Sequence, residues 1–125
     1  MDLEKILFVD DDELMAEFIT LTLQSIGGFE VMYCSSGLCA TDKVTEFMPD
    51  LILLDVMMPG MDGIETFNEL QKQPSSKYVP VIFLTGKNTA TNIKRYSDMG
   101  ALGVIGKPFN PEALCATIFS LWGNQ

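Results

Sequence analysis

Short apolar runs alternate along this chain with longer amphipathic stretches, and the two patterns predict different secondary structure. A short run bounded by turn residues is typical of a buried β-strand. Five such runs are expected to form strands: Lys5–Val9, Phe29–Cys34, Leu51–Leu54, Val79–Leu84 and Ala101–Ile105. The third run is continuously aliphatic, which is typical of a central strand in a parallel sheet that is covered on both faces.

The stretches between these runs repeat their apolar residues at helical spacing. Asp12 opens the first helix, Gly27-Gly28 ends it, and its apolar residues are Leu14, Met15, Phe18, Ile19, Leu21 and Ile26. Pro49 limits the second helix because proline disfavours the helical conformation of the residue before it. The other helices are expected after the turn Ser35-Ser36-Gly37 as far as Phe47, from about Gly63 to Lys72, over Asn88–Met99, and from Pro111 with Leu114, Ile118 and Leu121 on one face.

Strands and helices thus alternate regularly, which predicts an α/β domain with a doubly wound, five-stranded parallel sheet and five helices. Right-handed crossovers place helices on both sides of such a sheet. We find no internal repeat and no long linker, so residues 1–125 are expected to form a single domain.

Composition excludes several classes of function. The net charge is −9, which argues against direct nucleic-acid binding because a phosphate backbone requires a basic face. The chain has no histidine, so a catalytic, metal-binding or phosphorylated histidine is excluded. Cys34, Cys39 and Cys115 form no C-x-x-C pair and are expected to be free thiols. No apolar run is long enough to span a bilayer, so we expect a cytoplasmic protein without membrane contact.

Charged and polar residues follow four of the predicted strands. Asp10 and Asp11 follow the first strand, and Asp55 follows the third. Because the carboxyl ends of parallel strands line one crevice, these carboxylates are expected to converge there. Adjacent carboxylates repel each other unless a cation neutralises them, and Mg²⁺ prefers such oxygen ligands. An Asp-Asp pair can also simply cap a helix, and Asp55 can act as a metal ligand or as a nucleophile.

Thr85 and Lys107 follow the fourth and fifth strands. Thr85 offers a hydroxyl group, Gly86 an unobstructed backbone N–H, and Lys107 a compact positive charge that suits a phosphoryl oxygen or a carboxylate. Each of these residues alone is a weak signal, since a turn threonine and a solvated lysine are common. Together with the three carboxylates they predict a site for a cation and a phosphoryl group.

These residues resemble the receiver domain of two-component response regulators over essentially the whole chain. The matching stretches are ILFVDDDELM at 6–15, LILLDVMMPGMDG at 51–63, VIFLTG at 81–86 and GKPF at 106–109. The resemblance implies a flavodoxin-like sheet of order 2-1-3-4-5. It also implies that Asp55 is the phosphoacceptor for a histidine kinase or histidine phosphotransferase, and that Asp10, Asp11, Asp55 and the main-chain carbonyl of Met57 bind Mg²⁺. Thr85, Gly86 and Lys107 would then sense the phosphoryl group, and the bond before Pro108 would be cis.

The chain departs from this family at Val104, where relatives often carry an aromatic residue that rotates during switching. Signalling is therefore expected to use other parts of the face formed by the fourth helix, the fifth strand and the fifth helix, with Tyr96 as a candidate. Met57 and Lys87 occupy positions that in relatives influence the lifetime of the acyl phosphate. No output module follows the last predicted helix, so the expected output is a partner protein or a missing output domain.

Three other functions fit this sequence less well. A degenerate receiver that only binds partners would not need all five residues Asp10, Asp11, Asp55, Thr85 and Lys107. A Mg²⁺-dependent phosphatase with an aspartyl nucleophile usually has a second carboxylate two residues later, where this chain has Met57. A flavodoxin-type electron carrier needs N–H and hydroxyl groups around its phosphate, where this chain has carboxylates. We therefore expect a phosphoacceptor that assists its own phosphorylation and dephosphorylation rather than an enzyme.

Overall fold

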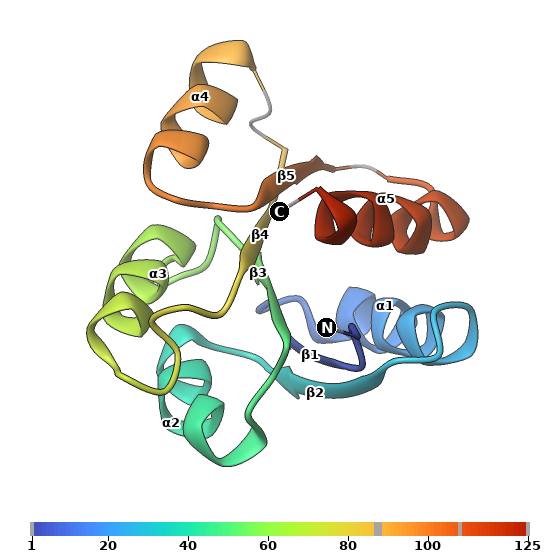
Figure 1. Ribbon diagram of the computed structural model, residues 1–125, viewed down its shortest axis with the longest axis horizontal. Helices are drawn as coiled ribbons and strands as arrows, with labels where there is room; N and C mark the ends of the chain where they lie inside the picture. Colours follow the sequence, from blue (N-terminus) through green and yellow to red (C-terminus); the bar gives the residue numbers. More distant parts are fainter. Residues whose placement is uncertain (1, 87–88, 108, 125) are drawn as a thin grey trace.

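Five parallel strands form one sheet with helices on both faces (Figure 1). The computed structural model describes residues 2–86, 89–107 and 109–124. The strands are β1 (Lys5–Val9), β2 (Glu30–Cys34), β3 (Leu51–Asp55), β4 (Val81–Thr85) and β5 (Gly103–Gly106), in the order β2-β1-β3-β4-β5. The helices are α1 (Glu13–Ser25), α2 (Gly37–Phe47), α3 (Gly63–Lys72), α4 (Ala90–Asp98) and α5 (Pro111–Gly123). The predicted fold class and strand order are confirmed.

The two faces of the sheet bury separate clusters of side chains. Alternate residues of the strands point to opposite faces, so Leu7 and Ile52 lie in one cluster and Ile6 and Leu53 in the other. Helices α2, α3 and α4 cover the first cluster, and α1 and α5 cover the second (Figure 1). Strands β1 and β3 are almost wholly buried between these layers, which accounts for their continuous apolar sequence.

The observed strands differ from the predicted ones at their ends. Strand β3 includes Asp55, whereas β2, β4 and β5 begin one or two residues later than predicted. Pro80, which has no N–H to donate to a ladder, directly precedes β4, and Gly100 with φ +105° makes a turn before β5. These differences shorten the sheet at its amino end, while β3, β4 and β5 each extend one residue further than predicted at the carboxyl end.

Helix α1 is where the sequence predicts it, but of the apolar residues at helical spacing Ile19 is buried while most of the others are exposed. Its buried residues are Ala16, Ile19, Thr22 and Leu23. By contrast, Leu14 is 84% exposed, Leu21 60% and Phe18 51%. Large apolar side chains therefore line the outer surface of α1.

The three cysteines are free, as predicted. Cys34 and Cys115 are buried and Cys39 is half-buried. Burial raises the pKa of Cys34 to about 12, so this thiol is an inert part of the core at neutral pH. Within the described ranges, none of the helices has the length and apolar character that crossing a bilayer requires.

Candidate functional site

The carboxyl end of the sheet carries the predicted site residues on a rigid backbone. The hydrogen-bond ladder continues one residue beyond β1, β3 and β5. The main-chain N–H of Asp10 donates to the carbonyl of Cys34 at 3.1 Å, that of Val56 to Leu84 at 3.0 Å, and that of Lys107 to Thr85 at 2.9 Å. Asp10, Asp55 and Lys107 therefore leave the sheet at fixed positions.

Asp10, Asp11 and Asp55 form one acidic cluster. One carboxylate oxygen from each residue lies within 4.8 Å of the other two. Asp10 and Asp55 are 0% and 3% exposed, whereas Asp11 is exposed to solvent. Three carboxylate oxygens around one point, with a side open to water, match the preference of Mg²⁺ for hard oxygen ligands and retained water. The cluster therefore fits a divalent cation.

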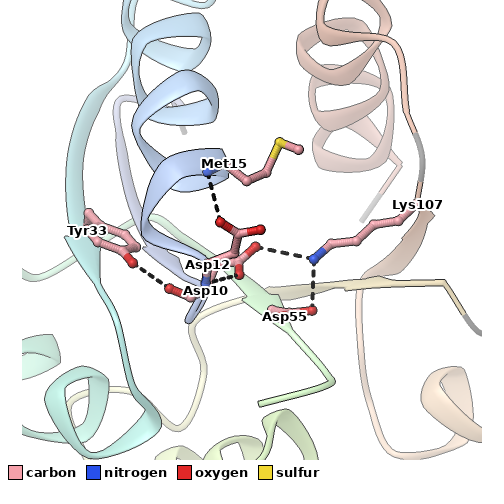
Figure 2. A network of polar contacts seen from close by, with 6 residues as sticks. All are labelled: Asp10, Asp12, Met15, Tyr33, Asp55 and Lys107. Atoms are coloured by element: carbon pink, nitrogen blue, oxygen red, sulfur yellow. Dashed lines mark hydrogen bonds and ion pairs between the residues drawn. The ribbon is translucent and has the colours of Figure 1, made fainter. Parts of the chain in front are cut away.

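Lys107 is the cation that faces this cluster in the described part of the chain. Its Nζ atom donates to Oδ2 of Asp10 at 3.3 Å and to Oδ1 of Asp55 at 3.1 Å (Figure 2). Burial alone would lower the pKa of Lys107, but the attraction of both carboxylates and the hydrogen bonds to them outweigh burial and raise it. Lys107 is therefore positively charged and lies between the two buried carboxylates.

The environment of Asp55 disfavours its ionised form. Burial and the nearby charge of Asp10 raise the pKa of Asp55 from 3.8 to about 6, against the opposing effects of Lys107 and of a hydrogen bond from the main-chain N–H of Met57. Asp55 is thus ionised at neutral pH in an unfavourable environment. A carboxylate of this kind gains from any additional positive charge placed beside it.

Asp10 is held by contacts on both its side chain and its main chain. Its Oδ1 atom accepts a hydrogen bond from the N–H of Asp12 at 3.0 Å, and Asp12 in turn caps α1 by accepting from Met15 at 3.1 Å. The hydroxyl of Tyr33 donates to the main-chain carbonyl of Asp10 at 2.6 Å (Figure 2). Sequence analysis missed Tyr33, because an aromatic residue in a strand gives no sign of where its hydroxyl ends.

Thr85 and Gly86 lie at the same edge of the sheet. Thr85 is fully buried at the end of β4, opposite Gly106 in the ladder, and its carbonyl accepts the N–H of Lys107. Gly86 is exposed, and a Cβ added to it would meet nothing within 4 Å, so its surroundings are open. Lys87, Asn88 and Pro108, including the predicted cis bond, lie outside the described residues.

The remaining sequence predictions concern Met57 and Val104. Met57 is 57% exposed and contacts Asp55 through its N–H, while the predicted role of its carbonyl stays a prediction. Val104 lies opposite Phe83 in the β4–β5 ladder and is half-buried against the core cluster that contains Tyr96. An aliphatic side chain therefore fills the position where relatives often carry an aromatic ring.

Comparison with known proteins shows which family has a similar sequence. The model of the response regulator receiver domain matches residues 6–119. The chain is 37% identical over 115 residues to the DNA-binding response regulator MtrA of Mycobacterium tuberculosis, which covers 92% of the chain and 49% of that protein. It is 39% identical over 116 residues to the CpxR homolog of Haemophilus influenzae, and this match covers 93% of the chain and 49% of that protein. The chain therefore spans about half the length of these relatives.

Solved structures show the same likeness over nearly the full chain. The chemotaxis protein CheY4 of Vibrio cholerae superposes with a TM-score of 0.87 at 32% identity, covering 96% of this chain and 99% of that one. The receiver domain of the sensor histidine kinase PA1611 of Pseudomonas aeruginosa, described with magnesium coordinated in its active-site cleft, superposes with a TM-score of 0.83 at 25% identity. That match covers 98% of this chain and 99% of that one.

Proposed function

This chain belongs to the response regulator receiver family, and from that premise we propose that it is a signalling switch that takes a phosphoryl group onto Asp55. The observation that carries the proposal is the position of Asp55. Its buried carboxylate ends a central strand, lies 3.1 Å from the ammonium group of Lys107, and shares a cluster with Asp10 and Asp11. Carboxylates of this kind form aspartyl phosphates.

We infer that Mg²⁺ is the cofactor, held by the carboxylates of Asp10, Asp11 and Asp55 with the main-chain carbonyl of Met57. The support is the oxygen-only donor set within 4.8 Å and the raised pKa of Asp55, which reflects excess negative charge and burial. When bound, Mg²⁺ supplies positive charge to the carboxylates and to the oxygens of the incoming phosphoryl group.

Phosphoryl transfer then needs little more than positioning from the chain itself. A carboxylate oxygen of Asp55 attacks the phosphorus of a phosphohistidine on a histidine kinase or histidine phosphotransferase. The P–O bond forms as the P–N bond breaks, and the departing imidazole nitrogen takes a proton from solvent. In this scheme Lys107, whose Nζ atom lies 3.1 Å from Asp55, pairs with a phosphoryl oxygen, and Thr85 and Gly86 contact the group once it is formed. The chain is a phosphoacceptor in this scheme rather than an enzyme acting on a separate substrate.

The donor protein must bring its phosphohistidine to the crevice, and the apolar surface of α1 is next to it. Met15 and Phe18 of α1 line a groove of about 540 Å³ together with Phe109 and Pro111, and Lys107 lines the same groove. Because Lys107 also contacts Asp55, a helix bound in this groove would place its histidine near the nucleophile. We infer that this surface receives the phosphodonor.

We propose that the output face is formed by α4, β5 and α5. The buried ring of Tyr96 on α4 contacts Phe83 on β4 with ring centroids 5.1 Å apart, and Phe83 lies two residues before Thr85. Val104 is the ladder partner of the same Phe83. A displacement of Thr85 would therefore reach α4 through Phe83 and Tyr96 without an aromatic residue at position 104. The readout is a partner protein or an output domain, and the net charge of −9 argues against direct nucleic-acid contact by this domain.

Mass spectrometry after incubation with Mg²⁺ and acetyl phosphate tests the proposal. The wild type should gain one phosphoryl group, and Asp55→Asn should gain none. Asp98→Asn, which removes an exposed carboxylate on α4, is the matched control and should be phosphorylated like the wild type. A wild type that stays unmodified with acetyl phosphate and with phosphoramidate would indicate a degenerate receiver. Sustained release of phosphate from p-nitrophenyl phosphate would indicate a phosphatase.

A further inference from the structure

We propose that Tyr33 is a positioning residue for the metal site, acting through the peptide bond that joins Asp10 to Asp11. This inference rests on the proposed function, because it assigns both aspartates as Mg²⁺ ligands. Tyr33 itself lies on β2, outside the acidic cluster, and its side chain points from that strand to the main chain of Asp10 (Figure 2).

The contact spans two steps of the β1–β2 ladder. Tyr33 is paired with Phe8, and their rings are in contact with centroids 5.9 Å apart. From this position the phenol reaches forward along β1, and its hydroxyl donates to the carbonyl of Asp10 at 2.6 Å. The last residue pair of the ladder is Val9 and Cys34, and the N–H of Asp10 makes its last hydrogen bond, to the carbonyl of Cys34. The Tyr33 hydroxyl thus supplies the donor that continued strand pairing would have supplied, and it satisfies a main-chain carbonyl at the edge of the core.

Two hydrogen bonds from β2 therefore fix Asp10 on both sides. The N–H of Asp10 donates to the carbonyl of Cys34 at 3.1 Å, and its carbonyl accepts from Tyr33. That carbonyl belongs to the planar peptide that connects Asp10 to Asp11. A change in the ψ angle of Asp10 would turn this peptide and move Asp11 relative to Asp10 and Asp55. By preventing the rotation, Tyr33 keeps two of the three proposed carboxylate ligands directed at the same point.

Because the Asp10 carbonyl accepts the hydrogen bond from Tyr33, its oxygen points toward β2 and away from the crevice. The side chain of Asp10 is then fixed separately by the N–H of Asp12 at 3.0 Å and by Lys107 at 3.3 Å. These main-chain and side-chain contacts together fix the direction in which the Asp10 carboxylate points. Groups that orient a ligand in this way affect metal affinity without touching the metal.

The test is a Mg²⁺ titration of three variants. Isothermal calorimetry measures the Mg²⁺ Kd of each variant, and phosphorylation by acetyl phosphate is measured as a function of Mg²⁺ concentration. Tyr33→Phe removes only the hydroxyl, and Tyr33→Leu removes the hydroxyl and the ring. Tyr78→Phe is the matched control, because Tyr78 is 85% exposed and lies outside the cluster. Thermal unfolding in EDTA measures the structural effect of each substitution separately.

We expect the Mg²⁺ Kd to rise by about threefold or more in both Tyr33 variants, because each loses the same hydrogen bond. The phosphorylation rate at saturating Mg²⁺ should stay near that of the wild type, and only Tyr33→Leu should lose much thermal stability. In metal-free Tyr33→Phe, the Asp10 amide should exchange its hydrogen faster than in the wild type.

The outcomes separate this inference from the proposed function. A wild type that binds no Mg²⁺ and takes no phosphoryl group would remove both. A wild type that does both, with a Tyr33→Phe variant whose Mg²⁺ affinity and Asp10 exchange equal those of Tyr78→Phe, would overturn the role of Tyr33 alone. A loss of Mg²⁺ affinity only in Tyr33→Leu would assign the effect to ring packing and would also overturn it.

Discussion

Replacing the proposed nucleophile should stabilise the metal-free protein at neutral pH. Burial and the charge of Asp10 raise the pKa of Asp55 from 3.8 to about 6. At about 1.4 kcal/mol for each pH unit, this difference disfavours the ionised carboxylate in the folded chain by about 3 kcal/mol relative to the unfolded chain. Asp55→Asn removes that penalty, because an amide of nearly the same shape carries no charge at any pH.

The sign of the effect follows from proton binding. Between pH 3.8 and about 6 the folded chain holds a proton on Asp55 that the unfolded chain has already released, so the free energy of unfolding falls as pH rises through this range. Above pH 6 the penalty is fully present. The Asn variant loses part of the gain, because Lys107 keeps only Asp10 as a charged partner. We therefore expect a net stabilisation of about 1–2 kcal/mol at pH 7.5 and none near pH 4.

Urea unfolding in EDTA at pH 7.5 and pH 4 measures this difference, and thermal unfolding should show a rise in Tm of about 3–5 °C per kcal/mol. Added Mg²⁺ should stabilise the wild type more than the variant and so reduce or reverse the order. Asp98→Asn, which breaks an exposed ion pair with Lys94, should change stability little at either pH. An Asn variant that is no more stable than the wild type at pH 7.5 in EDTA would refute the reasoning.

Two further substitutions test the contacts around Asp55. Lys107→Gln leaves Asp10 and Asp55 without their cation and should lower the free energy of unfolding by about 1–3 kcal/mol in EDTA, with most of the loss recovered in Mg²⁺; an equal loss in both buffers would contradict this. Gly63→Ala places a Cβ against the main-chain oxygen of Asp55 and 2.6 Å from Cα of Val56, so it should destabilise the fold by about 1–3 kcal/mol in urea unfolding. Gly123→Ala is its control, because a Cβ at this position has no neighbouring atom within 4 Å. Equal stabilities of the two variants would show that the first turn of α3 can move to accommodate the added methyl group.

The sequence was sufficient to place the cluster because its residues end strands or directly follow them. Parallel strands bring their carboxyl ends to one edge whatever the details of packing, so Asp10, Asp55, Thr85 and Lys107 had to meet there. The strand starts were less predictable. Pro80 and the turn at Gly100 limit β4 and β5 through backbone geometry that apolar runs do not reveal.

Two features depend on tertiary structure and could not be predicted. The spacing of Leu14, Phe18 and Leu21 indicates a helix but not which side of it meets the sheet, and these residues proved exposed. The Tyr33 contact depends on the β1–β2 register, because a shift of one residue would turn the phenol to the other face of the sheet. Periodicity therefore predicts the elements, while the orientation of each element is decided by packing.

All the charged groups that meet in the crevice come from the ends of strands and the loops that follow them, and within the described ranges no helix contributes a side chain to the acidic cluster. The helices instead carry the surfaces that a partner would meet, such as the exposed side chains of α1. Most of the proposed partner surface is thus encoded in helices and the proposed chemistry in strand ends, with Lys107 as a residue that lies in both. Substitutions on the helix surfaces can redirect the protein to a new partner during evolution while the proposed phosphoryl site stays unchanged.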